Sequence, residues 1–387
     1  MNSELSRRHF LAAGLAVPAA DAAGSTPAVS ASRPSPAAAP PLAGEKSLAY
    51  RTLGKTGLKV TTVGFGCMIT SDPTVISRAV DMGINYFDTS RGYQKGNNER
   101  MVGAALGSKR KDIILSSKVD AETRQGALDE LDTSLKELGT DHLDIWYLHG
   151  KSSPEDIKDE LVEAQEIARQ KGKVRFIGLS THRLPKVAPA ILQGGKMDVV
   201  LATYNFTMDP AMEEALRSLH QAGVGLVAMK VMAGGTRGKK PRPQMQRDGA
   251  AAAALKWVLK NPAVATTVPS MTDVEQLEEN FRVMAQSFSG DDERILAARL
   301  EEIRPLYCRM CGGCDGQCPR GLPVSDILRY LTYADGYGQF PLGRERFLEL
   351  PARLAEVRCG ECPTCPIQCP NGVRVRERLV RAQTLFA

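Results

Sequence analysis

The segment Tyr86-Phe87-Asp88-Thr89-Ser90-Arg91-Gly92-Tyr93 decides the fold assignment of this chain. It begins as a short apolar strand and becomes polar at Asp88, and Tyr93 follows in a loop that contains glycine. In parallel (β/α) barrels the catalytic groups lie at the C-terminal strand ends and in the loops that follow. The segment therefore indicates a barrel active site. The alternative for Asp88 is a turn former or helix cap, and the ends of the later strands decide between the two.

Apolar strands alternate with amphipathic helices around this segment. A short hairpin is predicted over 51–60, ahead of the first strand. Strands are expected at 62–66, 85–88, 113–118, 143–149, 176–180, 199–202, 225–229 and 265–269. Helices are expected between them, for example at 125–137, 154–169, 211–222, 249–260 and 273–287. Eight strand–helix units over about 240 residues match an α/β fold of the (β/α)8 TIM-barrel type. A doubly wound open sheet is the alternative, but no Gly-x-Gly-x-x-Gly follows the first strand.

The composition is that of a large globular chain, with 387 residues, 43% of them hydrophobic and only 5% aromatic. Small aliphatic side chains must therefore fill the core. The net charge is +6, but 50 Lys and Arg are mixed with 44 Asp and Glu along the chain. Because no basic face or nucleic-acid motif is visible, nucleic acid is not an expected partner. No apolar run reaches the roughly 18 residues of a membrane span.

The N-terminus has the pattern of a targeting segment. Ser6-Arg7-Arg8-His9-Phe10-Leu11 is a twin-arginine motif, an Ala-rich stretch follows, and Ala20-Asp21-Ala22 offers a cleavage site. A disordered basic tail is the alternative. We expect a signal over 1–23, the twin-arginine export machinery as a partner and a periplasmic or extracytoplasmic location. Residues 24–47 are rich in Pro, Ala and Ser and are predicted to form a flexible linker.

Eight of the nine cysteines form two groups near the C-terminus. The first group is Cys308, Cys311, Cys314 and Cys318-Pro319, and the second is Cys359, Cys362, Cys365 and Cys369-Pro370. Each has the Cys-x₂-Cys-x₂-Cys-x₃-Cys-Pro spacing of bacterial ferredoxins, which predicts two 4Fe–4S clusters. Since the fourth cysteine of such a run ligates the other cluster, Cys369 is expected with the first group and Cys318 with the second. Zinc and disulfides are the weaker alternatives.

Two further strands end in residues that match Asp88 and Tyr93 chemically. Strand 113–118 ends in Lys118, and strand 143–149 ends in His149. At this point the chain resembles the aldo/keto reductase family over about residues 50–290. The matching pieces are Leu53-Gly54-Lys55-Thr56-Gly57, Asp88-Thr89-Ser90, Tyr93, Lys118, Leu148-His149-Gly150, Ile177-Gly178-Leu179-Ser180 and Glu278-Glu279-Asn280. The resemblance implies a (β/α)8 barrel that reduces carbonyls with a nicotinamide cofactor.

The four strand-end residues suggest a mechanism. A carbonyl that accepts hydride gains negative charge on its oxygen and needs a proton there. A phenol with a pKa of about 10 is a poor acid at neutral pH, but a nearby ammonium lowers that pKa. We expect Lys118 to act on Tyr93 in this way and Asp88 to hold Lys118 charged. His149 is expected to hydrogen-bond the carbonyl oxygen or relay the proton, and the family assigns the same roles.

The resemblance also implies a cofactor site. Gly66, Cys67 and Met68 would line its nicotinamide end, and Ser180 would hold the carboxamide. The chain departs from the family at Thr181, where asparagine is usual.

The residues that would bind the 2′-phosphate of NADP differ from a common family pattern. Gln276 and Asn280 match one family branch, and the loop after the last strand retains no cation that could pair with a phosphate. The basic run at 237–247 either supplies the cation that would pair with the 2′-phosphate or is a solvated loop. The resemblance favours NADP, and NAD is the alternative.

The predicted organisation follows from these features. A barrel over 48–290 is followed by a linker over 291–306 and by a small, mostly helical, ferredoxin-like iron–sulfur domain over 307–387, which resembles the iron–sulfur branch of the family. The predicted function is an exported oxidoreductase acting on a small carbonyl substrate, with no membrane span after signal removal. The alternative is an electron-transfer protein whose clusters exchange electrons with a redox partner protein, while the barrel is a scaffold or is driven by that partner.

Overall fold

The computed structural model describes residues 48–234 and 249–387. These residues belong to one compact unit, Ala43–Ala387. The predicted signal and linker, and the basic run at 237–247, lie outside the described ranges.

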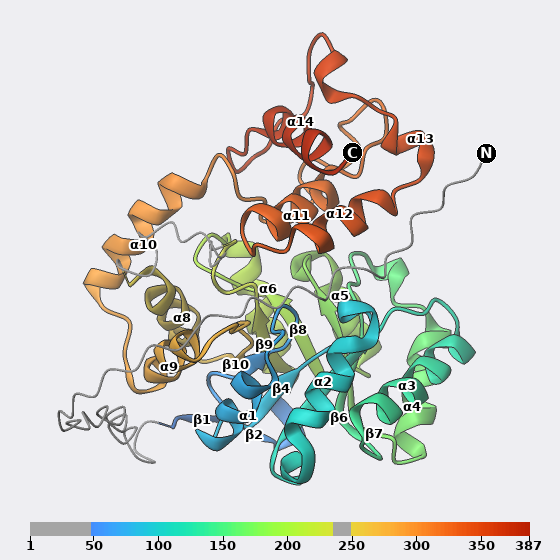
Figure 1. Cartoon of the computed structure of the whole chain (residues 1–387), viewed down its shortest axis with the longest axis vertical. Helices are drawn as coiled ribbons and strands as arrows, with labels where there is room; N and C mark the ends of the chain where they lie inside the picture. Colours follow the sequence, from blue (N-terminus) through green and yellow to red (C-terminus); the bar gives the residue numbers. More distant parts are fainter. Residues whose placement is uncertain (1–47, 235–248) are drawn as a thin grey trace, which may run out of the picture. The chain divides into compact units, whose positions relative to one another are not determined.

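Eight parallel strands form one sheet, in the order β10-β9-β8-β7-β6-β5-β4-β3 (Figure 1). The strands are β3 (Phe65–Gly66), β4 (Tyr86–Asp88), β5 (Ile114–Val119), β6 (Leu143–Leu148), β7 (Val174–Thr181), β8 (Val199–Thr203), β9 (Gly225–Met229) and β10 (Val264–Thr267). The first and last strands also meet, because the backbone N–H of Gly64 donates to Thr267 O at 2.8 Å and that of Gly66 donates to Pro269 O at 3.0 Å. The sheet is therefore a nearly closed barrel, as the alternating pattern predicts.

Helices connect successive strands and cover the outside of the barrel (Figure 1). They are α1 (Pro73–Asp81), α2 (Asn97–Leu106), α3 (Arg124–Leu138), α4 (Asp159–Gln170), α5 (Leu184–Gly194), α6 (Pro210–Gln221), α8 (Ala250–Lys260) and α9 (Val274–Arg282). Helix α3 shows how the sequence specifies such an element. The Thr123 side chain caps its N-terminus, Gly139 ends it at φ 63°, and the buried residues Leu131 and Leu135 share one face.

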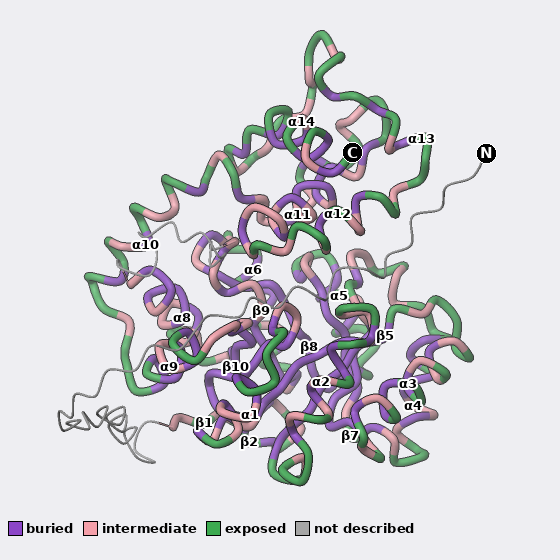
Figure 2. The backbone as a smooth tube through the Cα atoms, in the orientation of Figure 1, coloured by how far each residue is buried: buried purple, intermediate pink, exposed green. Residues whose placement is uncertain are grey.

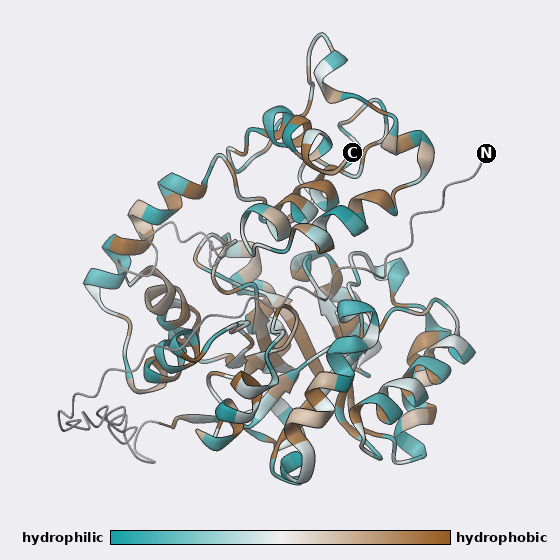
Figure 3. Ribbon diagram, viewed as in Figure 1, coloured by the Kyte–Doolittle hydropathy of each residue, from teal (hydrophilic) through white to brown (hydrophobic). Residues whose placement is uncertain are grey.

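The strands are buried (Figure 2) and mostly apolar (Figure 3), as expected for a parallel sheet covered by helices. An antiparallel hairpin, β1 (Tyr50–Thr52) and β2 (Lys59–Thr61), precedes the barrel. Leu53 and Val60 from this hairpin region are fully buried and belong to the same apolar cluster as side chains of the barrel strands. The hairpin thus packs against the barrel interior and leaves the C-terminal strand ends for the site.

The residues after the barrel form further helices: α10 (Gly290–Ile303), α11 (Val324–Asp335), α12 (Phe340–Leu348), α13 (Ala352–Ala355) and α14 (Val375–Phe386). The segment predicted to be a linker, 291–306, is therefore largely helical, and Asp292 of α10 pairs with Lys256 of α8 at 2.5 Å. A separate apolar cluster around Ile327 and Leu379 holds the later helices together. No helix within the described ranges combines the length and the hydropathy needed to cross a bilayer.

Candidate active site

The polar strand ends converge because their strands are neighbours in one parallel sheet. Asp88 is the last residue of β4, Lys118 lies in β5, and His149 directly follows β6. Tyr93 begins the short 3-10 turn η3 (Tyr93–Gly96) in the loop after β4. Parallel pairing of β4 with β5 and of β5 with β6 places all of these residues at the C-terminal edge, where a barrel active site is expected.

Lys118 and Asp88 form a buried ion pair. The ammonium of Lys118 donates to Oδ2 of Asp88 at 2.6 Å and to the backbone oxygen of Thr89 at 2.6 Å. Ser116 donates from its hydroxyl to the other carboxylate oxygen of Asp88 at 2.8 Å. Burial acts to lower the pKa of Lys118, but the Asp88 charge and the contact with Tyr93 outweigh it, so the net pKa is raised. Lys118 is therefore an ammonium at neutral pH.

Tyr93 lies against this ammonium, with its ring centroid 4.8 Å from Lys118 Nζ. Burial raises the pKa of Tyr93 more than Lys118 lowers it, and the resulting pKa is about 12. The expected effect of Lys118 on the Tyr93 pKa is thus present, but burial opposes it more strongly, because burial penalises the phenolate. Tyr93 is a protonated donor at neutral pH, and Lys118 can stabilise the phenolate that remains after the proton has left.

His149 is oriented by a carboxylate that sequence analysis missed. Its Nδ1 lies 2.7 Å from Oδ1 of Asp120, and its ring meets the Tyr93 ring edge-on at a centroid distance of 6.0 Å. A carboxylate only accepts, so Nδ1 carries the proton. Burial lowers the pKa of His149, which favours the neutral ring. In this tautomer Nε2 is an acceptor, and it donates only when the ring is protonated.

The signal for Asp120 was present in the sequence. It is the second residue after Lys118 and comes directly after β5, so it is another polar group at the same strand end.

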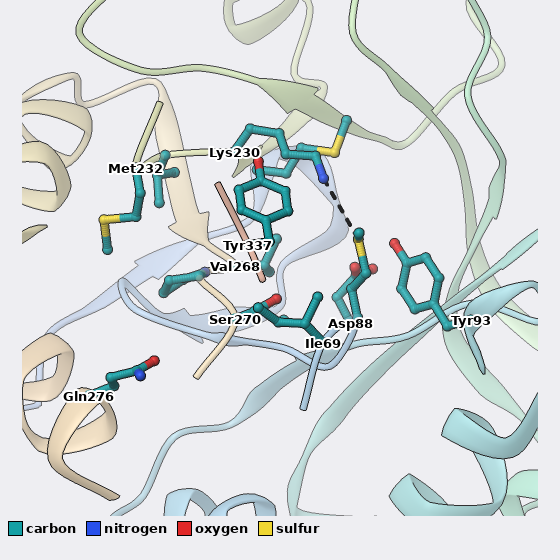
Figure 4. A pocket seen from close by; sticks show the side chains of 14 residues that line it. Ile69, Asp88, Tyr93, Lys230, Met232, Val268, Ser270, Gln276 and Tyr337 are labelled. Atoms are coloured by element: carbon teal, nitrogen blue, oxygen red, sulfur yellow. Dashed lines mark hydrogen bonds between the residues drawn. The ribbon is translucent and has the colours of Figure 1, made fainter. Parts of the chain in front are cut away.

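A cleft of about 760 Å³ of non-protein space opens beside these residues (Figure 4). It extends from Asp88 and Tyr93 to Gln276 on α9, and Gly66 and Met68 line it between them. The structure therefore brings three of the predicted cofactor residues, Gly66, Met68 and Gln276, to the cleft that holds the predicted proton donor.

The other predicted cofactor residues lie deeper. The Cys67 side chain is fully buried in the apolar core outside the barrel strands. The Ser180 hydroxyl oxygen accepts a hydrogen bond from the Gly150 backbone N–H at 2.9 Å, and the Thr181 hydroxyl oxygen accepts one from the Arg183 N–H at 2.9 Å. Asn280 is buried on α9. These contacts give Ser180 and Thr181 a role in shaping the loops after β6 and β7.

The cleft also contains residues that sequence analysis did not select. Lys230 follows β9 directly, in a left-handed conformation with φ 58°, and Tyr337 reaches the cleft from the loop after α11. The Nζ of Lys230 lies 5.2 Å from the ring centroid of Tyr333 and 5.1 Å from that of Tyr337. A lysine directly after an apolar strand was a visible signal for Lys230, whereas nothing in the sequence placed Tyr333 and Tyr337 beside it.

All nine cysteines lie in the described ranges and are free thiols. Burial raises the pKa of Cys308 to about 12, and the charges of Cys314, Cys311 and Cys369 add to this. Burial likewise raises the pKa of Cys359 to about 11, with additions from Cys318, Cys362 and Cys365. Thiols that interact in this way are neighbours, so each neighbourhood contains three cysteines of one run and the last cysteine of the other.

Backbone and side-chain N–H groups face several of these sulfurs. The Met310 N–H lies 3.3 Å from Cys308 Sγ, the Asn371 N–H lies 3.4 Å from Cys369 Sγ, and the Asn371 amide lies 3.3 Å from Cys311 Sγ. Donors of this kind favour thiolate over thiol. Within the described ranges, no group of three or more His, Cys, Asp or Glu side chains surrounds a single metal ion.

Comparisons with known proteins identify the family of this chain. Residues 71–250 match the model of the aldo/keto reductase family. The chain is 30% identical to L-galactose dehydrogenase of Arabidopsis thaliana over 66% of this chain and 95% of that protein. It is 29% identical to the uncharacterized oxidoreductase YqkF of Bacillus subtilis, over 66% of this chain and 97% of that protein.

A solved structure shows the same likeness. The holo form of aldo-keto reductase AKR11C1 from Bacillus halodurans matches with a TM-score of 0.57 and 26% identity, covering 65% of this chain and 96% of that chain. The family relationship supports a nicotinamide cofactor. The chain belongs to the aldo/keto reductase family and is an oxidoreductase enzyme.

Proposed function

We propose that this protein interconverts carbonyls and alcohols with NAD(P)H, with Tyr93 as the general acid. The observation that carries the proposal is the mutual contact of Tyr93, the Lys118–Asp88 ion pair and His149 at the C-terminal strand ends, where Asp88 and Tyr93 line the cleft. When bound, the nicotinamide supplies the hydride for the carbonyl carbon. Tyr93 donates its proton to the carbonyl oxygen, and Lys118 stabilises the phenolate that remains. Asp88 keeps Lys118 charged and fixed in place.

The test is reduction of a panel of small aldehydes and ketones by NADPH and NADH, followed with the Tyr93→Phe variant. The variant should lose about 10²–10⁴-fold in kcat, because the general acid is gone. Its dissociation constant for the cofactor should stay that of the wild type. Tyr50→Phe is the matched control, because Tyr50 is 49% exposed and lies in the hairpin. Unchanged turnover in Tyr93→Phe would remove Tyr93 as the acid.

For the cofactor, we propose NADP over NAD on the family resemblance. Gln276 lies near the N-terminus of α9 and lines the cleft, so it is placed to contact the bound cofactor. Fluorescence titration with both cofactors tests this directly. A much tighter complex with NADH would reverse the preference.

We further propose that the C-terminal cysteines bind two 4Fe–4S clusters. The support is the doubled ferredoxin spacing together with the two cysteine neighbourhoods, in which Cys369 and Cys318 are exchanged between the runs. In such a cluster each cysteine binds a different iron, so the sulfurs do not surround one ion as zinc ligands do. Iron and sulfide analysis of anaerobically purified protein tests the proposal, and absence of both would refute it.

The proposed route to the cell envelope rests on the N-terminal sequence alone. The twin-arginine motif would direct the folded, cofactor-loaded protein through the export machinery to the periplasm or another extracytoplasmic space. Fusing residues 1–47 to a reporter tests this, with Arg7→Lys/Arg8→Lys as the blocked variant. Equal export of both fusions would contradict the proposal.

One observation favours the second candidate function, electron exchange with a redox partner. The Tyr307 hydroxyl lies 3.2 Å from the Asn205 amide nitrogen, which donates to the Lys230 backbone oxygen at 3.1 Å. Since Cys308 follows Tyr307, these contacts connect a proposed cluster ligand to the cleft. Reduction of the clusters by NAD(P)H at the rate of turnover would establish electron transfer between the cleft and the clusters, which is the form of this function in which the partner drives the barrel. No reduction would leave the clusters structural or connected only to an external partner.

A further inference from the structure

We propose that the substrate carries a carboxylate beside its carbonyl, that Lys230 binds that carboxylate on the side of the cleft formed with the C-terminal helices, and that Arg329 adds to the positive field there. The inference rests on the proposed carbonyl chemistry and deepens it. The ligand class is therefore an oxo acid, or the corresponding hydroxy acid in the reverse direction.

Lys230 is the first part of the argument. It lines the same cleft as Asp88 and Tyr93, and Figure 4 shows its ammonium directed toward the part of the cleft where these residues lie. Its contacts are weak ones: the Met68 sulfur at 3.7 Å and the faces of Tyr333 and Tyr337. In the described part of the chain no carboxylate lies within ion-pair distance of Lys230. A half-buried ammonium with such partners is suited to bind an anion.

Arg329 on α11 is the second cation. One of its terminal nitrogens pairs with Asp326 at 3.0 Å, and its buried Nε has no hydrogen-bond partner within the described residues. Its charge and that of Lys230 act on the same two groups, Tyr333 and His182. The carboxylates nearby are already paired, Asp88 with Lys118 and Asp326 with Arg329.

Three titratable groups respond to the resulting positive field. Burial acts to raise the pKa of Tyr333, but Arg329, Lys230 and Arg346 outweigh it and the net pKa is lowered. Burial lowers the pKa of Lys230, and Arg329 adds to this. Burial lowers the pKa of His182 well below its usual value, and Arg329 and Lys230 add to this. An anion bound among these groups is stabilised by the same field.

The position of this field favours the substrate over the cofactor as its ligand. Both ligands carry anionic oxygens: the substrate would present a carboxylate, and the cofactor would present a diphosphate. Lys230 lines the cleft together with Asp88 and Tyr93, and its Nζ lies 3.7 Å from the Met68 sulfur and 5.2 Å from the Tyr333 ring centroid, so the ammonium is at the reacting end of the cleft. A nicotinamide cofactor places a ribose between its reacting ring and its diphosphate, whereas an oxo acid has its carboxylate next to the carbonyl.

The test compares an oxo acid with its neutral ester. Benzoylformate and methyl benzoylformate are reduced by the full-length enzyme with NADPH, and the ratio of their kcat/KM values is measured. The wild type should prefer the acid. In Lys230→Met the ratio should fall by about 10- to 100-fold, the value of a hydrogen bond to a charged group, and in Arg329→Gln it should fall less, because Arg329 contributes only through its charge. Lys230→Arg should retain the preference for the acid, because it keeps the positive charge. This variant therefore distinguishes loss of the charge from a folding defect.

Lys260→Met is the matched control. Lys260 also lies over an aromatic ring, that of Phe288 at 5.3 Å, but belongs to α8 outside the cleft. Its ratio should equal that of the wild type.

Each other outcome is decisive. If the wild type uses ester and acid equally, the carboxylate site is refuted while carbonyl reduction stands. If the variants raise the cofactor dissociation constant and leave the ratio unchanged, the anion is the cofactor diphosphate and the proposal is again refuted. If neither compound nor any other carbonyl of the panel is reduced, the proposed function itself fails.

Discussion

The Nζ of Lys118 lies 2.6 Å from Oδ2 of Asp88, and both side chains are almost completely buried, at 1% and 5% exposure. The pair persists because each charge is neutralised by the other and by hydrogen bonds from Ser116 and to Thr89. Removing one partner leaves an uncompensated buried charge, which costs far more than the pair itself contributes.

Lys118→Met should therefore lower the free energy of unfolding by about 3–5 kcal/mol. Adding Asp88→Asn should restore part of that loss, because the unpaired charge is gone. Urea unfolding under anaerobic conditions measures both. Lys109→Met is the control: its partner Asp81 and Lys109 itself are about half exposed, so the change should cost about 1 kcal/mol or less. Equal losses in Lys118→Met and Lys109→Met would contradict the burial argument.

Asp120→Ala should lower kcat by about 10- to 100-fold, because a charge-assisted hydrogen bond that fixes the His149 tautomer is lost. The Asp120 charge also raises the His149 pKa, so the variant should shift any His149 limb in the pH profile to lower pH. Asp141→Ala is a matched control, since Asp141 forms a 2.7 Å contact with the ring of His142. A wild-type kcat in Asp120→Ala would remove Asp120 from the site.

The pH dependence of kcat/KM should reflect two tyrosines, Tyr93 and Tyr333, whose pKa values are shifted in opposite directions. Tyr93 must be protonated to donate, so its contribution is complete below its pKa of about 12 and is lost only above it. Tyr333 has a lowered pKa, and its phenolate would repel an anionic substrate. The kcat/KM for an oxo acid should therefore decline as the pH rises through the Tyr333 pKa, below 10.

In Tyr333→Phe the part of that decline caused by the phenolate should disappear, while the part caused by loss of the Lys230 charge at its own lowered pKa should remain. The neutral ester should show neither part in the wild type. Steady-state kinetics between pH 7 and the alkaline limit of enzyme stability measure both compounds. An unchanged profile for the acid in Tyr333→Phe would contradict the role given to Tyr333.

The exchange of Cys318 and Cys369 between the clusters can be tested with double variants. Cys311→Ala/Cys369→Ala removes two ligands expected on one cluster and should lose about four of eight irons. Cys311→Ala/Cys318→Ala removes one ligand from each cluster and should disturb both. Cys67→Ala should keep all the iron, because Cys67 is buried in the apolar core outside the barrel strands. The reverse result for the two double variants would show that each run binds its own cluster.

The barrel was predictable because it depends on patterns short enough to read along the chain. Most strands from β4 to β10 contain a short apolar run, and helices such as α3 have local caps and an apolar face. Asp88, Lys118 and His149 were predictable for the same reason: parallel strands bring their C-terminal ends to one edge. Helix α10 was missed, since charged residues dominate the first turn of α10, at Asp291, Asp292 and Glu293.

The sequence by itself determined the parallel barrel, the residues at its strand ends and the two cysteine runs, because periodicity and spacing are local properties. Tertiary structure alone decided that Asp120 orients His149, that Tyr333 and Tyr337 meet Lys230, and that burial opposes the effect of Lys118 on the Tyr93 pKa. These outcomes depend on how much water each group loses and on which charges approach it. In the case of Lys230 and Tyr333, the approaching groups are about a hundred residues apart along the chain, so only the folded arrangement sets their electrostatics.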